Sequence, residues 1–251
     1  MSTATTVTPP QREPELLGQT VVVIGGSAGI GFETARRARA EGADVILTGR
    51  DPERLERAGR ELGAIGTEAF DATDPDRLER FFDDLPKPLD HLMVSGGGPY
   101  YAPLAEMDLG EARRDIDRHL LVQLQVGQHA VGTVRPGGSL LFISGTGGRR
   151  RGAGLTLIGA VTAATPALVE NLAVELAPIR VNLIAAGFVD TALSASLLGE
   201  GLDARRAELR ETLPIGRVVG PEDVAALAVH LMSNTALTGA TFDIDGGQKL
   251  V

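Results

Sequence analysis

The sequence predicts one α/β domain in which a doubly wound, seven-stranded parallel sheet is flanked by helices. Short apolar runs alternate with amphipathic stretches along the chain, and this alternation favours right-handed crossovers between parallel strands. The length of 251 residues and the hydrophobic share of 43% suit a single domain with one continuous core. The sequence contains no internal repeat and no interdomain linker.

The first predicted strand, residues 19–24, is a β-branched run of the kind that a parallel sheet buries on both faces. A glycine-rich turn and a helix follow it. Six further apolar runs complete the predicted sheet, at residues 44–48, 69–70, 91–94, 139–144, 179–185 and 241–244. Pro166 indicates that the helix before the sixth strand either kinks or begins at that residue.

Two segments stand apart from this alternation. Residues 1–17 are rich in Thr, Pro and Glu, so we expect a mobile N-terminal tail before a nucleotide-binding domain over residues 18–251. Residues 193–217 contain two short helical patterns in an apparent insertion before the last helix. Insertions of this kind often form lids, and we expect a lid here.

Charge and composition exclude several classes of partner. A net charge of −9 and a pI near 5.0 disfavour binding to a phosphate backbone, so we expect no nucleic-acid partner. The chain has no cysteine, which excludes disulfides, zinc-thiolate sites and thiol nucleophiles and suits a reducing cytoplasm. We expect no metal site, and no uninterrupted apolar run reaches the roughly 20 residues that span a bilayer.

A glycine-rich segment joins the first strand to the first helix. Gly25 suits a tight turn, Gly29 a close approach of backbone to a pyrophosphate, and Gly31 close packing of helix on strand. The helix N-terminus, beside Ser27 and Ile30, offers unpaired N–H groups to phosphates. Such a spacing also fits an ordinary tight turn, but its position after a buried strand indicates the nucleotide site of a Rossmann fold.

The end of the second strand bears on which cofactor is bound. A protein that prefers NAD places an acidic residue there for the ribose 2′-hydroxyl, whereas this chain has Gly49 and Arg50. A guanidinium suits a 2′-phosphate, with Ser27 as a possible second donor. The alternative is a solvated arginine whose charge Asp51 neutralises. We therefore predict NADP(H) as the cofactor.

The order of motifs resembles the short-chain dehydrogenase/reductase family over roughly residues 18–251. The glycine turn is followed, in family order and spacing, by matches at residues 71–72, 172–176, 180–182, 187–191, 216–217, 221–223 and 245–247. The resemblance implies that cofactor contacts beyond the glycine turn come from Asp71 and Ala72 near the adenine, Gly96 and Gly97 under the nicotinamide ribose with Ser95 beside them, and Val189 and Thr191 at the carboxamide.

The catalytic residues of that family are missing. Its tyrosine and lysine, spaced Tyr-x-x-x-Lys on one helix, fall on Ile158 and Thr162, and its serine falls on Gly145. A tyrosine near an ammonium exchanges a proton with the substrate oxygen, and neither replacement can do this. Every other alignment register fails as well, because the chain's only lysines are Lys87 and Lys249 and no tyrosine lies on that helix.

Tyr100 is one candidate replacement, because it follows the fourth strand at the carboxyl edge of the sheet, where open α/β proteins bind ligands. The alternative is that Tyr100 and Tyr101 cap the core or the lid. Ser144 can bind a substrate oxygen, or it can satisfy backbone groups at its strand end.

His119 is the other candidate, at the family's asparagine position on a helix predicted over residues 115–131. Histidine titrates near neutral pH and can act as an acid or a base. The alternative is a helix histidine satisfied by a backbone carbonyl, since Leu120, Leu121 and Leu124 mark this as a buried face.

Three functions fit these observations. The first is an NADP(H)-dependent oxidoreductase with a non-standard catalytic site and an unknown small-molecule substrate, favoured by the intact segment 187–191. The second is a nonredox enzyme for elimination, isomerisation or cyclisation on the same fold. The third is a catalytically inactive subunit that senses or binds NADP(H). For each we expect no membrane partner and a homo-oligomer, either a tetramer or a dimer, as the resemblance implies.

Overall fold

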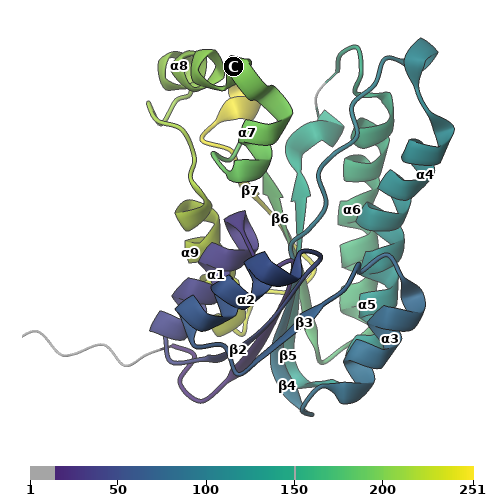
Figure 1. Ribbon diagram of the computed structural model, residues 1–251, viewed down its shortest axis with the longest axis vertical. Coiled ribbons are helices and arrows are strands. Elements are labelled where there is room, and N and C mark those ends of the chain that lie inside the picture. Colours follow the sequence, from purple (N-terminus) through teal and green to yellow (C-terminus); the bar gives the residue numbers. More distant parts are fainter. Residues whose placement is uncertain (1–14, 150) are drawn as a thin grey trace, which may run out of the picture.

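The computed structural model, described for residues 15–149 and 151–251, contains the predicted doubly wound sheet (Figure 1). Its seven strands are all parallel and lie in the order β3-β2-β1-β4-β5-β6-β7. The strands are β1 (Thr20–Ile24), β2 (Asp44–Gly49), β3 (Gly66–Ala69), β4 (Leu89–Val94), β5 (Val134–Gly145), β6 (Arg180–Ala186) and β7 (Thr241–Ile244). The single-domain Rossmann fold is confirmed.

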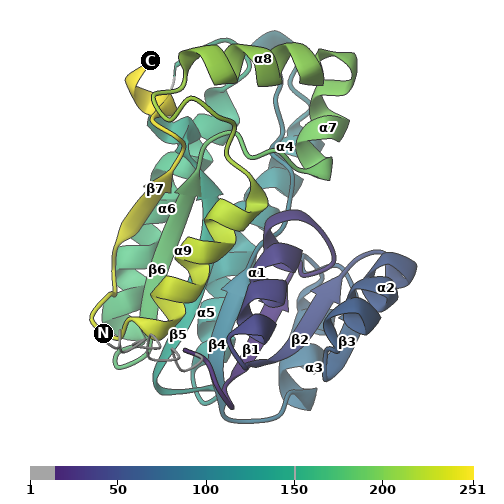
Figure 2. The ribbon, with the colours of Figure 1, turned by 90° about the vertical axis from the view of Figure 1, so that its left-hand side faces the viewer.

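Helices cover both faces of the sheet (Figures 1 and 2). One face carries α1 (Gly29–Ala40), α2 (Pro52–Leu62) and α9 (Pro221–Ser233). The other face carries α3 (Pro75–Asp84), α4 (Leu109–Ile116), α5 (Val122–Ala130) and α6 (Thr156–Glu175). Each face therefore has its own layer of buried side chains, as the apolar runs of a doubly wound sheet require.

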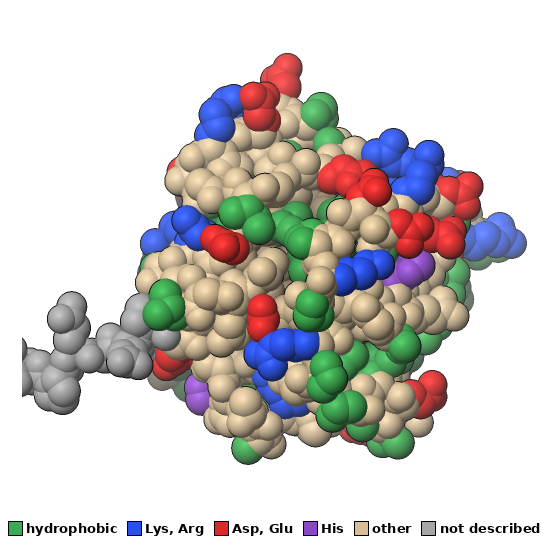
Figure 3. Space-filling model, turned by 90° about the horizontal axis from the view of Figure 1, so that it is seen from below, with side chains coloured by type: hydrophobic (Ala, Val, Ile, Leu, Met, Phe, Trp, Pro, Cys, Tyr) green, Lys and Arg blue, Asp and Glu red, His purple; other side chains and the backbone are tan. Residues whose placement is uncertain are grey.

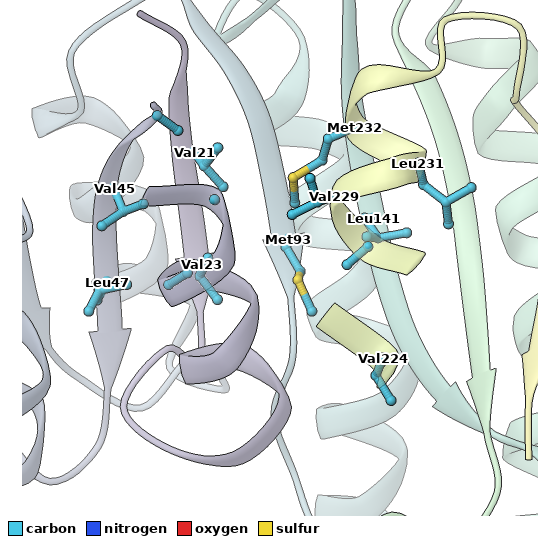
Figure 4. Packing of buried hydrophobic residues seen from close by; sticks show 14 of the residues in the cluster. Val21, Val23, Val45, Leu47, Met93, Leu141, Val224, Val229, Leu231 and Met232 are labelled. Atoms are coloured by element: carbon cyan, nitrogen blue, oxygen red, sulfur yellow. The ribbon is translucent and has the colours of Figure 1, made fainter. Parts of the chain in front are cut away.

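The first layer is the one that Figure 4 draws from close by. Val224 and Val229 of α9 lie against the strands that present Met93 and Leu141, and Val23 continues the layer towards α1. All these side chains are almost completely buried. Burial of a side chain of this size contributes about 1.5–3 kcal/mol relative to exposure, so this layer fixes α1 and α9 on the sheet.

Strand order reverses between β1 and β4, which are neighbours although β2 and β3 intervene in sequence. At such a switch point the loops after the two strands diverge and leave a crevice at the carboxyl edge. Two short helices, α7 (Ala192–Leu198) and α8 (Leu202–Thr212), stand above this edge (Figures 1 and 2). They occupy most of the predicted insertion at 193–217, while its role as a lid stays a prediction.

Several details differ from the sequence expectations. Of the predicted tail, residues 1–14 lie outside the described residues, but Leu16 is fully buried and its N–H donates to the carbonyl of Glu41. Residues 15–17 therefore belong to the folded domain. Of the two alternatives for Pro166, a helix start there is wrong, because α6 begins at Thr156 and runs through Pro166. Thr165 Oγ1 donates to the carbonyl of Val161 one turn earlier.

The helix predicted over residues 115–131 begins earlier, at Leu109, and contains a π turn at Asp117–Leu121 between α4 and α5. The expected buried face is also misplaced. Leu121 and Leu124 are 46% and 43% exposed, whereas Val122 and Val126 face the core. The wider π turn changes the angular position of every later residue, which a pattern based on 3.6 residues per turn does not anticipate.

The helix α6 is the one described helix long and apolar enough to cross a membrane by length and composition. In this fold it packs on the sheet instead, with Val161 and Val169 buried. A core helix of an ordinary α/β domain has the same composition.

The amino-terminal edge of the sheet, seen in Figure 3, carries basic side chains next to acidic ones, including the pairs Arg39–Asp44 and Arg135–Asp90. Behind them His91 is buried, with Nδ1 2.8 Å from Ser139 Oγ and Nε2 2.6 Å from Gln19 Oε1. Because an amide oxygen only accepts, Nε2 carries a proton, and in the neutral ring Nδ1 accepts a hydrogen bond from the Ser139 hydroxyl. Burial lowers the pKa of His91 to about 4.

Lowering the pH from 7 to 5 should destabilise the wild-type protein more than the variant His91→Gln. The folded-state pKa of His91, about 4, lies below the ordinary value of 6.5, so in this range the unfolded state binds more protons than the folded state. The free energy of unfolding therefore decreases as the pH is lowered. For His91 the loss amounts to about 2 kcal/mol. Urea unfolding of both proteins at the two pH values measures it, and an equal loss in both would contradict it.

Candidate functional site

The turn between β1 and α1 lies directly against the end of β4. Gly25 has a φ of +88°, and a methyl group added there would overlap the carbonyl oxygen of Ser95. A methyl group on Gly31 would overlap the carbonyl oxygen of Gly25. Gly29, with a φ of +56°, has only the side chain of Thr191 nearby, 3.6 Å from where its Cβ would stand. The three predicted glycines are thus required by close backbone approach and by positive φ.

The N-terminus of α1 differs from those of the next three helices. Side chains of Asp51, Asp74 and Asp108 cap α2, α3 and α4 by accepting backbone N–H bonds. The N-cap of α1 is Ala28, whose side chain makes no hydrogen bond. The first turn of α1 contains no acidic residue. The first N–H groups of α1, including that of Ile30, are therefore available to an anionic ligand, as the sequence predicts.

The end of β2 carries one cation that has no partner among the described residues. Asp51 does not neutralise Arg50, because its Oδ1 accepts the N–H of Arg54 at 3.0 Å, a bond that also lowers the pKa of Asp51. Arg50 is exposed, and it makes no hydrogen bond or ion pair with residues 15–149 or 151–251. Ser27 lies beside it, since a methyl group on Gly49 would stand 2.8 Å from Ser27 Oγ. Arg50 and Ser27 can thus both reach a ligand at this strand end.

Two further predicted contacts follow β3. Asp71 is exposed, and its Oδ1 accepts from the N–H and the hydroxyl of Thr73 in a tight turn. Ala72 packs against the layer formed by α3 and α5. The turn brings both residues to the same edge of the sheet as Gly25, because all the strands are parallel.

The segment after β6 closes the other side of the crevice. Val189 is buried and pairs with Val219, and Thr191 caps α7 by accepting the N–H of Ser194. From α7, Leu193 reaches the segment after β4, 3.1 Å from where a Cβ on Gly98 would stand. Segment 187–191 and the start of α7 therefore lie between the glycine turn and the segment after β4.

The positions of the family's tyrosine and lysine are both buried. Ile158 and Thr162 lie on the inner face of α6, and Thr162 Oγ1 donates to the carbonyl of Ile158 at 2.7 Å. Small residues surround Thr162, and beside it a cavity of about 200 Å³ is lined by Gly145, Thr146, Gly148, Arg149, Thr162, Ala163, Pro166, Leu183 and Ala185. No protonatable side chain stands at either position.

His119 faces the segment after β4. Its ring approaches Gly97, whose added Cβ would stand 3.7 Å from Cε1 of His119. Its Nδ1 lies 2.9 Å from the carbonyl oxygen of Asp115, which is the backbone contact foreseen as the structural alternative. That bond uses one ring nitrogen only, so the contact and a chemical role for Nε2 are compatible.

The other two candidates differ in how their hydroxyls are placed. Tyr100 turns towards the start of α4, where its phenol oxygen accepts the N–H of Asp108 at 3.0 Å. This contact favours the capping alternative, although the phenol retains its own proton to donate. Ser144, at the end of β5, makes no side-chain hydrogen bond to the rest of the described chain. Its hydroxyl is half-buried on the face of the sheet that carries α6.

Two residues that the sequence interpretation did not single out also belong to this region. Asp115 is fully buried, and one of its carboxylate oxygens lies 3.4 Å from Nδ1 of His119. The stem of Arg118 lies over Gly97, with Cβ and Cδ 3.5 and 3.6 Å from where its Cβ would stand. The spacing of four residues between Asp115 and His119 was the signal in the sequence that could have indicated their contact, because residues so spaced are neighbours on one side of a helix.

Comparison with known proteins agrees with this architecture. A family model described as Enoyl-(Acyl carrier protein) reductase matches residues 25–249. The short-chain dehydrogenase/reductase ATR9 of Stachybotrys chlorohalonatus is 30% identical, over 94% of this chain and 99% of its own length.

Solved structures give the same result. MalC reductase/Diels-Alderase from Malbranchea aurantiaca has a TM-score of 0.88 and 25% identity, over 95% of this chain and 99% of its own. BdcA, solved in complex with NADPH, has a TM-score of 0.84 and 27% identity, over 93% of this chain and 95% of its own. The sheet order, the glycine turn and these matches together make this protein a member of the short-chain dehydrogenase/reductase family.

Proposed function

We propose that this protein is an NADP(H)-dependent oxidoreductase in which a histidine takes the place of the missing tyrosine as proton donor. The observation that carries this proposal is the place of His119 beside Gly97, on the same segment after β4 whose Ser95 carbonyl meets Gly25 of the glycine turn. An uncapped α1 N-terminus and the glycine turn form the phosphate half of the crevice, and His119 lies beside Gly97 in the nicotinamide half. An adenine-binding subunit would have no use for the second half.

The residues fit a phosphorylated dinucleotide. Gly25 and Gly31 allow the tight packing of the turn against β4 and of α1 against the turn, and Gly29 has no backbone near its Cβ position, so a pyrophosphate could approach there. Arg50, which has no partner among the described residues, and Ser27 beside it would hold the 2′-phosphate. Two similar structures were solved with NADPH, which supports the choice of cofactor. The bound cofactor would supply hydride; the protein must then supply the proton.

His119 is suited to supply that proton. Its Nδ1–H donates to a backbone carbonyl, so the proton that can move is the one on Nε2. When the ring is protonated, Nε2–H can pass its proton to the oxygen of a carbonyl substrate as the hydride reaches carbon. Ser144, with its free hydroxyl at the end of β5, would bind the same oxygen. The product is an alcohol and the ring is left neutral.

A nonredox enzyme is the second candidate. Its support is the buried, uncharged pair Ile158 and Thr162, together with the similarity to MalC, whose name joins a reductase with a Diels-Alderase. A pocket that holds a reactive substrate without an acid on α6 suits cyclisation. The third candidate, a sensing subunit, would bind NADP(H) and perform no chemistry. For each of these three functions we propose a cytoplasmic protein, which a chain without cysteine suits.

We infer that the protein is a homo-oligomer, a tetramer or a dimer, in which a second copy of this chain covers the outer face of the α4–α5 helix. Ile116, Leu121 and Leu124 expose apolar side chains along that face. The strand β7 is also an open edge of the sheet and can join an edge contact. A shared helix face and a shared edge fit the oligomers of this family.

Light scattering at micromolar protein concentration should therefore give the mass of a dimer or tetramer. The double variant Leu121→Glu, Leu124→Glu should have a smaller mass in solution, because the assembly dissociates. Burial of charged side chains in a helix interface opposes association. A wild-type monomer would sink this inference.

The substitution Arg50→Ala should weaken NADP(H) binding by about 10–100-fold, the equivalent of one lost charge-assisted contact, and should leave NAD(H) binding nearly unchanged. Fluorescence titration with both cofactors measures the two constants. The neighbouring Arg54→Ala is the control, since Arg54 contributes its backbone N–H to Asp51. Wild-type binding of NAD(H) as tight as that of NADP(H) would contradict the assignment.

If hydride transfer occurs, His119→Ala should lower its rate by about 10²–10⁴-fold, the usual share of general acid catalysis. Tyr100→Phe should have a smaller effect, because the Tyr100 phenol oxygen is turned towards Asp108. Tyr101→Phe, at a side chain that is 54% exposed, is the matched control. Stopped-flow oxidation of NADPH measures all three. Full activity in the His119 and Tyr100 variants would mean that water or the substrate supplies the proton.

A further inference from the structure

A column of polar residues lies on the buried face of the α4–α5 helix. Asp115, His119 and Gln123 follow each other at intervals of four residues, and only 0%, 9% and 3% of their surfaces are exposed. Spacing of four residues places side chains on one face of a helix. An apolar stripe is expected at such a face, and Val122 and Val126 beside it have that character.

Of the three residues in this column, Asp115 has the largest free-energy cost of burial. Its Oδ1 accepts the backbone N–H of Tyr100 at 3.1 Å and lies 3.4 Å from Nδ1 of His119. Its Oδ2 is buried and has no hydrogen-bond partner among the described residues. Burial of a carboxylate with so few donors opposes folding, and an aliphatic side chain at this position would avoid the cost.

The geometry fixes which nitrogen of His119 carries a proton. Nδ1 lies 2.9 Å from the carbonyl oxygen of Asp115, and a carbonyl oxygen can only accept. Nδ1 is therefore protonated in both charge states of the ring. Nε2 is the nitrogen that gains or loses a proton, so it can act as an acid in the charged state and as a base in the neutral one.

Few charged side chains lie on the segments packed against the π turn. The helix α6 packs against the turn, and its first half, residues 156–165, contains no charged side chain, whereas its second half carries Glu170 and Glu175. The helix α4 carries Glu111 in its first turn, where it pairs with Arg114. The segment after β4, residues 94–101, contains no charged side chain, and its titratable groups are the phenols of Tyr100 and Tyr101. On the helix itself the nearby charges are those of Asp115, Asp117 and Arg118.

We propose that Asp115 is a positioning residue that orients His119 through its carbonyl and stabilises the charged imidazolium through its buried carboxylate. In the proposed reaction the Nε2–H bond breaks and an O–H bond forms on the substrate. The ring keeps its Nδ1–H and becomes neutral, and Asp115 exchanges no proton with the substrate. This role rests on the proposed function, but the state of the ring does not and can be measured without any substrate.

The first test uses protein labelled with ¹⁵N-histidine, in which His119→Gln identifies the His119 signals. The neutral wild-type ring should carry its proton on Nδ1, and the opposite tautomer would overturn the proposal without any variant. In Asp115→Asn the ratio of charged to neutral ring at a fixed pH near 6.5 should fall by about tenfold or more, as the loss of a close carboxylate predicts. Asp117→Asn, which removes a carboxylate on the same turn, should leave that ratio within about twofold. Equal changes in both variants would contradict the proposal.

The second test separates positioning from a structural role. The asparagine can still accept the N–H of Tyr100, so Asp115→Asn should melt at the wild-type temperature or above it. With a carbonyl substrate kcat should nevertheless fall about 10–100-fold, with KM within about twofold. A lower melting temperature with parallel losses in kcat and a wild-type charge ratio would show that Asp115 is merely structural. If wild type never oxidises NADPH, the proposed function fails, whereas the spectroscopic result still decides the Asp115–His119 interaction.

Discussion

The close approach of two backbone segments determines the geometry of this molecule. The carbonyl oxygen of Ser95 stands where a side chain on Gly25 would be, so β1 and β4 can end side by side only because residue 25 is glycine. From that contact the chain diverges, into α1 on one face of the sheet and towards α4 on the other. Around this edge of the sheet Thr191 lies near Gly29 at the uncapped start of α1, and Leu193 and His119 lie near Gly98 and Gly97.

The two halves of the crevice differ in character. The phosphate half follows the pattern of the family, with bare backbone and a helix N-terminus that carries no acidic side chain. On α6, Ile158 and Thr162 are buried at the positions of the family's tyrosine and lysine, and a cavity lies beside Thr162. The titratable pair of this region is at the neighbouring π turn instead, where buried Asp115 contacts His119. Under the proposed function the proton therefore comes from this turn and not from α6.

The fold could be predicted from the sequence because strand patterning and glycine turns are local signals. The run 20–24 and the glycines after it define a strand and a helix regardless of their surroundings. Features that depend on tertiary contacts were not predictable. Asp51 caps α2 instead of pairing with Arg50, and Leu121 and Leu124, expected on a buried face, are exposed at and just after a π turn that the sequence pattern does not indicate. The spacing of Asp115 and His119 places them on one side of a helix, but the burial of Asp115 depends on tertiary packing and has no signal in a charged helix.

Isotope transfer is the direct test of whether this chain moves hydride without a tyrosine on α6. A single turnover with NADPH deuterated at C4 of the nicotinamide, against a panel of aldehydes, ketones and enones, would be analysed by mass spectrometry of the products. The account predicts deuterium on carbon in at least one product with the wild-type protein, and its loss in the same time with His119→Ala. Tight binding of the labelled NADPH with no deuterium in any product would contradict it.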